Sequence, residues 1–338
     1  MKLIREFRRD LAVGALCLVV ILAVGLLIQH PWPRDFLTSL FAYGLLAMSL
    51  NLLIGFTGLV SFGHAAFFAF GGYTFGLLLQ WEGFTLGLGG FSVPVAFLAA
   101  LAGTALYALV IGAICVRLSE IYFAFLTLAF QMFLYSVIIS WVDLTGGDQG
   151  LMGGIPRPPF LGIDLADQHD RFIVCAVLFV LCLLVLRVVT ESPFGYTLRM
   201  VRDNPTRAAF LGINVFRVKL ISFVVAGTVA SVGGVVLALF TSGAYPEWAF
   251  WAQSGEAIFM IMLGGVTVFL GPVLGAALLR LLNDVVQSYT SHNEIVIGIV
   301  ILLVVLGLRR GILDFIKDWF SDRRQARLAG ESRSGRGE

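Results

Sequence analysis

Long apolar runs alternate along the chain with short polar stretches. Five of these runs contain no Asp, Glu, Lys or Arg: 11–28, 36–57, 93–116, 121–142 and 220–240. Each is close to the roughly 20 apolar residues with which a helix crosses the hydrocarbon core of a bilayer. The pattern therefore predicts an all-α, polytopic membrane protein.

Basic residues gather in the polar stretches and predict how the chain is oriented. Lys and Arg are concentrated in 1–10, 191–219 and 309–338, whereas 143–171 contains five Asp and two Arg. Because loops rich in Lys and Arg stay on the cytoplasmic side, we expect the first three segments inside and 143–171 outside. The expected organisation is a cytoplasmic N-terminal segment, a transmembrane domain over 11–308 and a basic cytoplasmic tail.

This orientation fixes the parity of the membrane crossings. It predicts about ten spans in all, near 11–28, 36–54, 61–79, 93–116, 121–142, 172–190, 220–240, 254–270, 272–288 and 293–308. The region 254–288 also fits one long span, and a piece of it could be re-entrant. Non-helical backbone at membrane depth is tolerated only where protein or a water-filled cavity covers it.

Two apolar regions, 50–74 and 262–276, are interrupted by Gly or by Gly and Pro. Broken membrane segments in the two halves of a chain indicate a transport site. Small residues also simply allow membrane helices to pack closely. Both interpretations stay open. We expect Gly-rich broken or re-entrant helices in the membrane domain.

The composition agrees with a membrane protein and excludes several site types. The chain is 59% hydrophobic and 13% charged, with a mean hydropathy of +0.93, whereas soluble domains carry roughly a quarter charged residues. All four cysteines lie in apolar runs. Their spacing indicates neither a metal site nor a disulfide framework.

A transporter needs a source of energy, and the sequence restricts the choice. It has no G-x-x-x-x-G-K-[ST] loop, so the chain is not a P-loop ATPase. Few ionisable residues lie inside the predicted spans, mainly His64, Glu256 and Arg280. This scarcity argues against a proton-driven carrier, although sodium coupling through carbonyls stays open. We predict a transport subunit that is not itself an enzyme.

The remaining source is a partner that hydrolyses ATP, which needs a docking element on the inner face. Segment 191–219 is long for a bundle connection and alternates Arg with apolar residues. Ser192 followed by Pro193 suits a helix start, Pro205 predicts a break, and Gly212 predicts a helix end. A basic loop that only enforces topology is the alternative. The apolar face, formed by Leu198, Val201, Ala208, Ala209 and Leu211, favours docking.

At this point a family resemblance is visible. The stretch "SLNLLIGFTGLVSFGHAAFFAFGGYT" resembles the signature of the branched-chain amino acid ABC transporter permeases. The matching residues are Asn51, Gly55, Thr57, Gly58, Ser61, Gly63, His64, Ala65, Ala66, Phe67, Gly71, Tyr73 and Thr74. Gly72 stands where the family often has Ala.

Three further stretches resemble the same family in the same order. The first is "IYFAFLTLAF" with "LTGGDQGLMGGIP", including Thr127; one extra Gly precedes Ile155. The second resembles the cytoplasmic coupling loop through Ser192, Gly195, Arg202, Asn204, Ala208, Ala209, Gly212 and Ile213, with Tyr196 in place of the usual Arg and Arg199 nearby. The third matches through Gly264, Gly265, Gly271, Pro272, Gly275 and Ala276, with Thr267 replacing a glycine.

The resemblance implies an ATP-driven importer in the bacterial inner membrane. The acidic, Gly-rich outer loop is typical of its LivM-type subunits. The implied partners are a LivH-type second permease, one or two kinds of ABC ATPase subunit, a periplasmic binding protein and membrane lipid, with no nucleic acid. ATP and magnesium would bind the ATPase, and this chain would bind no cofactor or metal. Branched-chain or related small amino acids are the expected substrates; urea, short-chain amides and aromatic acids are family alternatives, and an ion-coupled carrier is a further one.

These considerations select two sets of candidate residues. For the translocation path they are Asn51, Gly55, Thr57, Gly58, Ser61, Gly63, His64, Thr127, Gly264 and Gly265. For ATPase coupling they are Gly195, Arg199, Arg202, Asn204, Ala208, Ala209 and Gly212. His64 could contact substrate, but a hydrogen-bonded packing histidine that holds the break in shape is the favoured interpretation.

Overall fold

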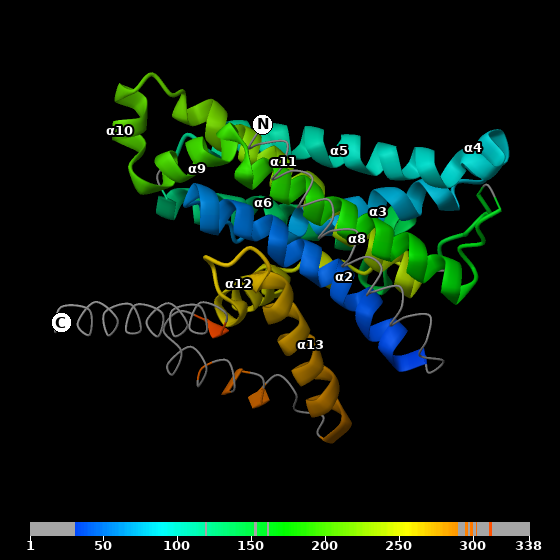
Figure 1. Cartoon of the computed structure of the whole chain (residues 1–338). Helices are drawn as coiled ribbons and strands as arrows, with labels where there is room; N and C mark the ends of the chain where they lie inside the picture. The colour runs from blue at the N-terminus through cyan, green and yellow to red at the C-terminus, as the bar shows by residue number, and fades with distance from the viewer. Residues whose placement is uncertain are drawn as a thin grey trace, which may run out of the picture. The chain divides into compact units, whose positions relative to one another are not determined.

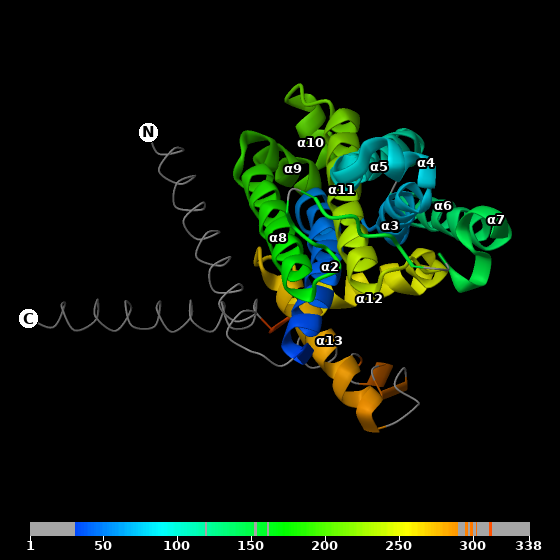
Figure 2. The same cartoon turned by 90° about the vertical axis from the view of Figure 1, so that its right-hand side faces the viewer.

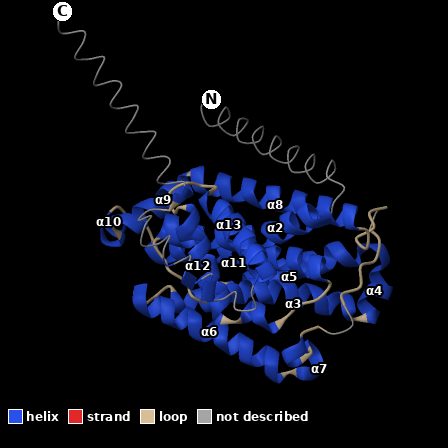
Figure 3. Ribbon diagram, turned by 90° about the horizontal axis from the view of Figure 1, so that it is seen from below, coloured by secondary structure: helices blue, strands red, loops and turns tan. Residues whose placement is uncertain are grey.

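The computed structural model describes residues 31–118, 120–151, 154–160 and 162–289, and the isolated positions 295, 296, 298, 299, 302, 311 and 312. Over this part of the chain the secondary structure is helical, and the only β feature is an isolated bridge between Phe160 and Ile163 (Figure 3). The predicted span 11–28, the N-terminal segment 1–10 and nearly all of 293–338 lie outside the described residues.

The chain divides into two compact units, residues 1–258 and 259–338. In the first, four helices form the central packing group: α2 (Pro31–Asn51), α3 (Ala65–Gln80), α5 (Ser92–Cys115) and α11 (Val215–Thr241). Around them, α8 (Gln168–Glu191) packs on α2, and α6 (Glu120–Ser140) packs on α3 and α5 (Figures 1 and 2). Most of α2 and α11 is buried, whereas most residues of α5 and α6 are only partly buried or exposed. Their exposed apolar side chains suit hydrocarbon surroundings rather than water.

Five helical stretches among the described residues are long and apolar enough to cross a membrane: Trp32–Thr57, Glu82–Cys115, Ile121–Ser140, Gln168–Glu191 and Val215–Thr241. They correspond to the predicted spans 36–54, 93–116, 121–142, 172–190 and 220–240. The helix in the predicted span 61–79, α3, has only 16 residues, about 24 Å at 1.5 Å per residue. It is thus shorter than the roughly 30 Å hydrocarbon core. The total of ten spans stays a prediction.

The predicted break in 50–74 is confirmed. At Asn51, α2 passes into a π-helix, η1 (Leu52–Thr57), which ends at Gly58 with φ +77°. The amides of Gly58 and Leu59 both donate to the Leu53 carbonyl. Residues 58–64 are non-helical, and α3 begins at Ala65. Glycine is needed at position 58 because L side chains rarely adopt that backbone conformation.

A second break separates α12 (Trp251–Gly264), which begins in the first unit and ends in the second, from α13 (Gly271–Tyr289). Region 254–288 is therefore two helices and not one, and the break begins at Gly265, with φ +114°, earlier than the predicted turn. A Cβ at Gly264 would lie 1.8 Å from the Gly271 carbonyl oxygen, and one at Gly275 would lie 1.8 Å from that of Met260. Glycine at these positions lets the two backbones touch.

Before α8 begins at Gln168, the described part of the predicted outer loop 143–171 contains only short helical elements, α7 (Val142–Thr145) and η3 (Gly147–Gln149). Its residues 150–157 are joined to the end of α11: the Leu151 amide donates to the Ala244 carbonyl at 2.9 Å, and the Ile155 amide to that of Ser242 at 2.8 Å. Arg157 donates to the Leu239 carbonyl and to the Ser242 hydroxyl. The remaining short elements are α4 (Glu82–Leu88), η2 (Gly89–Phe91) and η4 (Pro246–Ala249).

Candidate functional site

The break between α2 and α3 contains a buried group of polar side chains. Ser49, Asn51, Thr57, Ser61 and His64 are each at most 1% exposed. The Nε2 atom of His64 lies 2.9 Å from Ser49 Oγ, and the Thr57 hydroxyl donates to the Leu52 carbonyl. Within the described chain, Ser61 Oγ and His64 Nδ1 have no hydrogen-bond partner. Polar groups so rare in an apolar core mark this break as the candidate site.

A hydrogen-bonded chain ties this site to two further helices. The Ala65 amide, at the start of α3, donates to Ser254 Oγ at 2.9 Å. Ser254 Oγ donates to Gln131 Oε1 at 2.7 Å, and Gln131 Nε2 donates to the Phe250 carbonyl at 2.8 Å. Helix starts leave amides without partners, and here a side chain from residue 254 supplies one. The network therefore joins α3, α6 and the first turn of α12.

Sequence reasoning missed Ser49, Gln131 and Ser254 as members of this site. The available signal was a lone polar side chain inside an otherwise apolar helix, which is costly to bury unless it is hydrogen-bonded. The partners themselves could not be read from the sequence, because Ala65 and Ser254 are 189 positions apart.

Thr127 and Gly63, both predicted for the path, are in contact. A Cβ at Gly63 would lie 2.1 Å from the Thr127 carbonyl oxygen and 2.9 Å from Thr127 Cβ. The Thr127 hydroxyl donates to the Ala124 carbonyl in its own helix. The loop before α3 thus packs directly on α6, and glycine is required by space at this position.

The structure does not bring all predicted path residues into one described group. Asn51, Gly55, Thr57, Gly58, Ser61, Gly63, His64 and Thr127 belong to the first unit, whereas Gly264 and Gly265 belong to the second. Within the second unit, Gly264 and Gly265 form the close contact between α12 and α13.

The predicted coupling segment folds as two short helices, α9 (Pro193–Asp203) and α10 (Pro205–Phe210). Ser192 Oγ accepts from the Gly195 amide at 3.3 Å, and Asn204 Oδ1 accepts from the Arg207 amide at 2.8 Å. These are ordinary N-caps followed by proline in the first turn. Gly212, with φ +84°, follows α10. The predicted cap, break and end are confirmed.

The apolar residues of this segment divide differently from the prediction. Leu198 and Val201 are buried because α9 packs on α8, the π-helix and α11, and Ala208 is buried because α10 packs on α9 and α11. The apolar side chains left exposed include Tyr196, Met200, Ala209, Phe210 and Leu211. Three residues of the predicted face thus contribute to the core of the subunit, whereas Ala209 and Leu211 remain exposed. Tyr196, Met200 and Phe210 join these two on the surface available to a partner.

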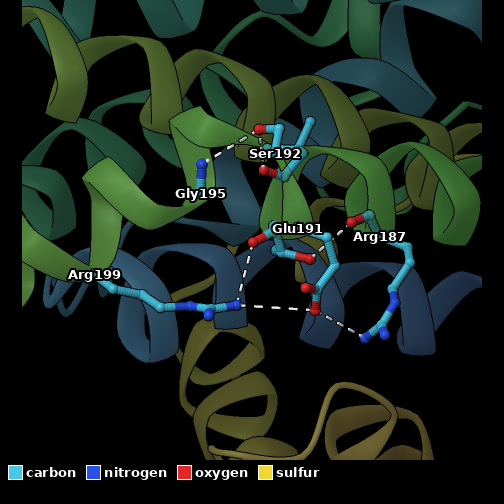
Figure 4. A network of polar contacts seen from close by, with 7 residues as sticks. Arg187, Glu191, Ser192, Gly195 and Arg199 are labelled. Carbon is cyan, nitrogen blue, oxygen red and sulfur yellow. Dashed lines mark hydrogen bonds and ion pairs between the residues drawn. The ribbon is translucent and has the colours of Figure 1, made fainter. Parts of the chain in front are cut away.

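An ion cluster connects α8 to α9 (Figure 4). Glu191 Oε1 lies 3.3 Å from Arg187 Nη1 and 3.9 Å from Arg199 Nη2, and Arg199 Nη2 donates to the Thr190 carbonyl at 3.2 Å. A Cβ at Gly195 would lie 2.1 Å from that carbonyl oxygen. Since the ion pairs are partly exposed, they contribute little stability. The close approach at Gly195 is what fixes α9 against the end of α8.

The predicted coupling segment also contacts the π-helix directly. The Arg202 guanidinium donates through Nη1 to the Gly55 carbonyl. Arg199 Cζ lies 5.2 Å from the centre of the Phe56 ring, and a Cβ at Gly58 would lie 2.9 Å from Arg202 Cγ. Residues predicted separately for coupling and for the path are therefore in contact.

Comparison with known proteins decides the family. The model of the family described as "Branched-chain amino acid transport system / permease component" matches residues 33–305. The chain belongs to this family. The match confirms the resemblance seen in the sequence and extends from the first turn of α2 to beyond the end of α13. With five apolar helices among its described residues that are long enough to cross a membrane, this family member is a multi-pass membrane permease.

Curated relatives agree with this family. The chain is 26% identical over 303 residues to the high-affinity branched-chain amino acid transport system permease protein LivM of Escherichia coli K12, covering 82% of this chain and 69% of that protein. It is 23% identical over 283 residues to the permease protein LivH of the same strain, covering 80% and 91%. LivM of Salmonella typhimurium is 26% identical over 319 residues, covering 85% and 73%.

Proposed function

We propose that this permease is the LivM-type transmembrane subunit of an ATP-driven importer for branched-chain or related small amino acids. It would receive substrate from a periplasmic binding protein and work beside a LivH-type permease. The family match over 33–305 carries the transport class. The two-helix segment 193–213 has an exposed apolar face, which supports ATP hydrolysis by a docked partner as the source of energy.

That exposed face is the proposed docking surface for an ABC ATPase subunit, which would hold ATP and magnesium. Tyr196, Met200, Phe210 and Leu211 are 56%, 42%, 88% and 65% exposed, and Arg207 is also exposed. Aromatic residues, Met and Arg are enriched in protein interfaces. A large apolar side chain such as Phe210 in a water-facing segment favours a protein partner over a purely topological role.

The outer loop 143–171 is proposed as the contact for the binding protein. This loop and the coupling segment stand at the two ends of α8, whose 24 residues extend about 36 Å. Since that length exceeds the hydrocarbon core, the geometry supports opposite membrane faces. The acidic loop would then be outside and the Arg-containing segment inside, with both termini cytoplasmic.

The break between α2 and α3 is the proposed part of the translocation path. Asn51, Thr57, Ser61 and His64 are the polar side chains at the break. They are buried in this conformation, so substrate contact would require the break to open. The His64–Ser49 contact supports a packing role for His64. Gly55, Gly58 and Gly63 would allow the close packing that the break needs, and Gly264 and Gly265 would do so in the second unit.

Reconstitution tests the proposal. The purified permease pair, ATPase subunits and binding protein are placed in proteoliposomes, and uptake of radiolabelled leucine is measured with valine, isoleucine, urea, acetamide and phenylacetate as competitors. We expect uptake that needs both ATP and the binding protein, with competition by valine and isoleucine. Competition only by urea, acetamide or phenylacetate would refute the substrate class. Uptake by this chain alone, driven by an ion gradient, would refute the ATP-driven mechanism.

A further inference from the structure

We infer that Arg202 and Arg199 hold the end of the π-helix η1 and thereby transmit the position of the coupling segment to the broken membrane helix. Both are positioning residues, since neither is placed against substrate. The inference rests on the proposed function only for the origin of the motion, an ATPase docked on the exposed face of α9 and α10. The contacts that carry it lie wholly within this chain.

The first contact replaces a backbone hydrogen bond that the break removes. In a π-helix each carbonyl pairs with the amide five positions on. For Gly55 that amide belongs to Val60, which lies beyond the helix end at Gly58. Arg202 Nη1 donates to the Gly55 carbonyl instead. A guanidinium is well suited to this place, because the last carbonyls of a helix carry partial negative charge.

The second and third contacts fix the arginines against the same turn. Arg199 Cζ lies 5.2 Å from the Phe56 ring centre, a cation–π distance. The Arg202 side chain runs across Gly58, where a Cβ would lie 2.9 Å from Arg202 Cγ. On its other side the Arg202 guanidinium pairs with Asp203 Oδ1 at 3.1 Å. Arg202 thus contacts the Gly55 carbonyl and Gly58, and Arg199 contacts the Phe56 ring, so both arginines pack on the turn 55–58.

The helix α9 connects its solvent-exposed face to this turn. Tyr196 and Met200, four positions apart, are exposed, whereas Leu198, Val201 and the Arg202 contact lie on the side packed against the subunit. Residues three and four apart share a helix face. A partner that pulls on the exposed face therefore moves the face that holds η1.

Movement of η1 would reach the buried polar site through the chain itself. Ser61 and His64 follow Gly58 by three and six positions, in the non-helical loop 58–64. Ser61 Oγ and His64 Nδ1, which have no hydrogen-bond partner among the described residues, therefore lie in the segment that a change in the π-turn would move first. π-helical turns are rare and frequently occur at functional sites, which fits a turn whose conformation is set from outside.

Hydrogen exchange in the complete transporter tests the inference without knowledge of the substrate. The complex is held in lipid nanodiscs with and without a non-hydrolysable ATP analogue, and exchange is followed by mass spectrometry in peptides covering 52–64. In the unsubstituted protein we expect the analogue to change exchange of this peptide by tenfold or more. The substitution Arg202→Ala is expected to reduce that response to less than twofold while the ATPase remains bound.

Matched variants keep the test decisive. Arg217→Ala removes the same charge from an exposed position of the same inner segment, and its response should be unchanged. Phe56→Leu alters only the membrane-helix side of the contact and should weaken the response even if Arg202→Ala fails to assemble. A full response in both Arg202→Ala and Phe56→Leu, or an equal loss in Arg217→Ala, would overturn the inference. Failure of the unsubstituted chain to bind any ATPase would refute the proposed function instead, and the inference with it.

Discussion

His64 Nε2 lies 2.9 Å from Ser49 Oγ, so one hydrogen bond spans the two sides of the helix break. If this bond serves packing, His64→Ala and Ser49→Ala should each lower the stability of the subunit by about 1–3 kcal/mol. The double substitution should cost less than the sum, because each single change already breaks the same bond. Thermal unfolding of the purified permease measures all three.

Transport kinetics separate packing from substrate contact at His64. We expect uptake by both single variants to keep the KM of the unsubstituted importer once corrected for the amount of folded protein. A rise in KM for His64→Ala that Ser49→Ala does not share would assign substrate contact to the imidazole.

Gly63 should tolerate no side chain. In Gly63→Ala the new Cβ would lie 2.1 Å from the Thr127 carbonyl oxygen, so α3 or α6 must shift. We expect a loss of more than about 2 kcal/mol of stability, as for other overpacked cores. Gly87→Ala is the matched control, since nothing lies within 4 Å of its added Cβ; it should be neutral or slightly stabilising. Equal melting temperatures for the two variants would contradict the close contact.

Ser254 should contribute to the stability of the permease more than its small side chain suggests. Ser254→Ala leaves the Ala65 amide and Gln131 Oε1 without the hydroxyl that joins them, and unsatisfied buried groups cost about 1–3 kcal/mol each. The exposed Ser288, whose hydroxyl donates to the Val285 carbonyl of its own helix, provides the control. We expect Ser254→Ala to lower the melting temperature and Ser288→Ala to leave it unchanged; the reverse order would refute the network.

The two faces of the coupling segment should give opposite phenotypes. Phe210→Ala removes an exposed ring and should weaken co-purification of the ATPase with little change in the stability of the permease. Leu198→Ala creates a cavity at a fully buried position and should cost about 2–5 kcal/mol. Melting curves and pull-down yields of the two variants measure both effects. Unchanged ATPase binding by Phe210→Ala would show that the Phe210 ring is not part of the docking surface.

Much of the fold was predictable because apolar length and charge position are local properties. Among the described residues, the uncharged apolar runs 36–57, 93–116, 121–142 and 220–240 are helical as predicted. Ser192, Pro205 and Gly212 correctly marked the start, break and end of the predicted coupling helices, because caps and breaks depend on neighbouring residues. The break at Gly58 followed from glycine in an apolar segment. Its π-helical form could not be predicted from the sequence. In that form the Leu53 carbonyl accepts from the amides of Gly58 and Leu59, and the Gly55 carbonyl accepts from the distant Arg202.

The site was less predictable because its contacts join residues far apart in sequence. Arg202 was selected for coupling and Gly55 for the path, but their 147-position separation hid the contact between them. For the same reason Leu198 and Val201 looked like a docking face although they are buried. Periodicity identifies an apolar face; it does not tell whether that face meets the subunit's own core or a partner.

The central claim, an importer powered through an inner-face segment, is tested most directly by the sidedness of Phe210. In a variant whose four native cysteines are replaced, Phe210→Cys is exposed to a membrane-impermeant maleimide in right-side-out and in inside-out vesicles. We predict labelling only in inside-out vesicles, and protection when the ATPase subunit is bound. Labelling of intact right-side-out vesicles would place this segment outside and contradict the account.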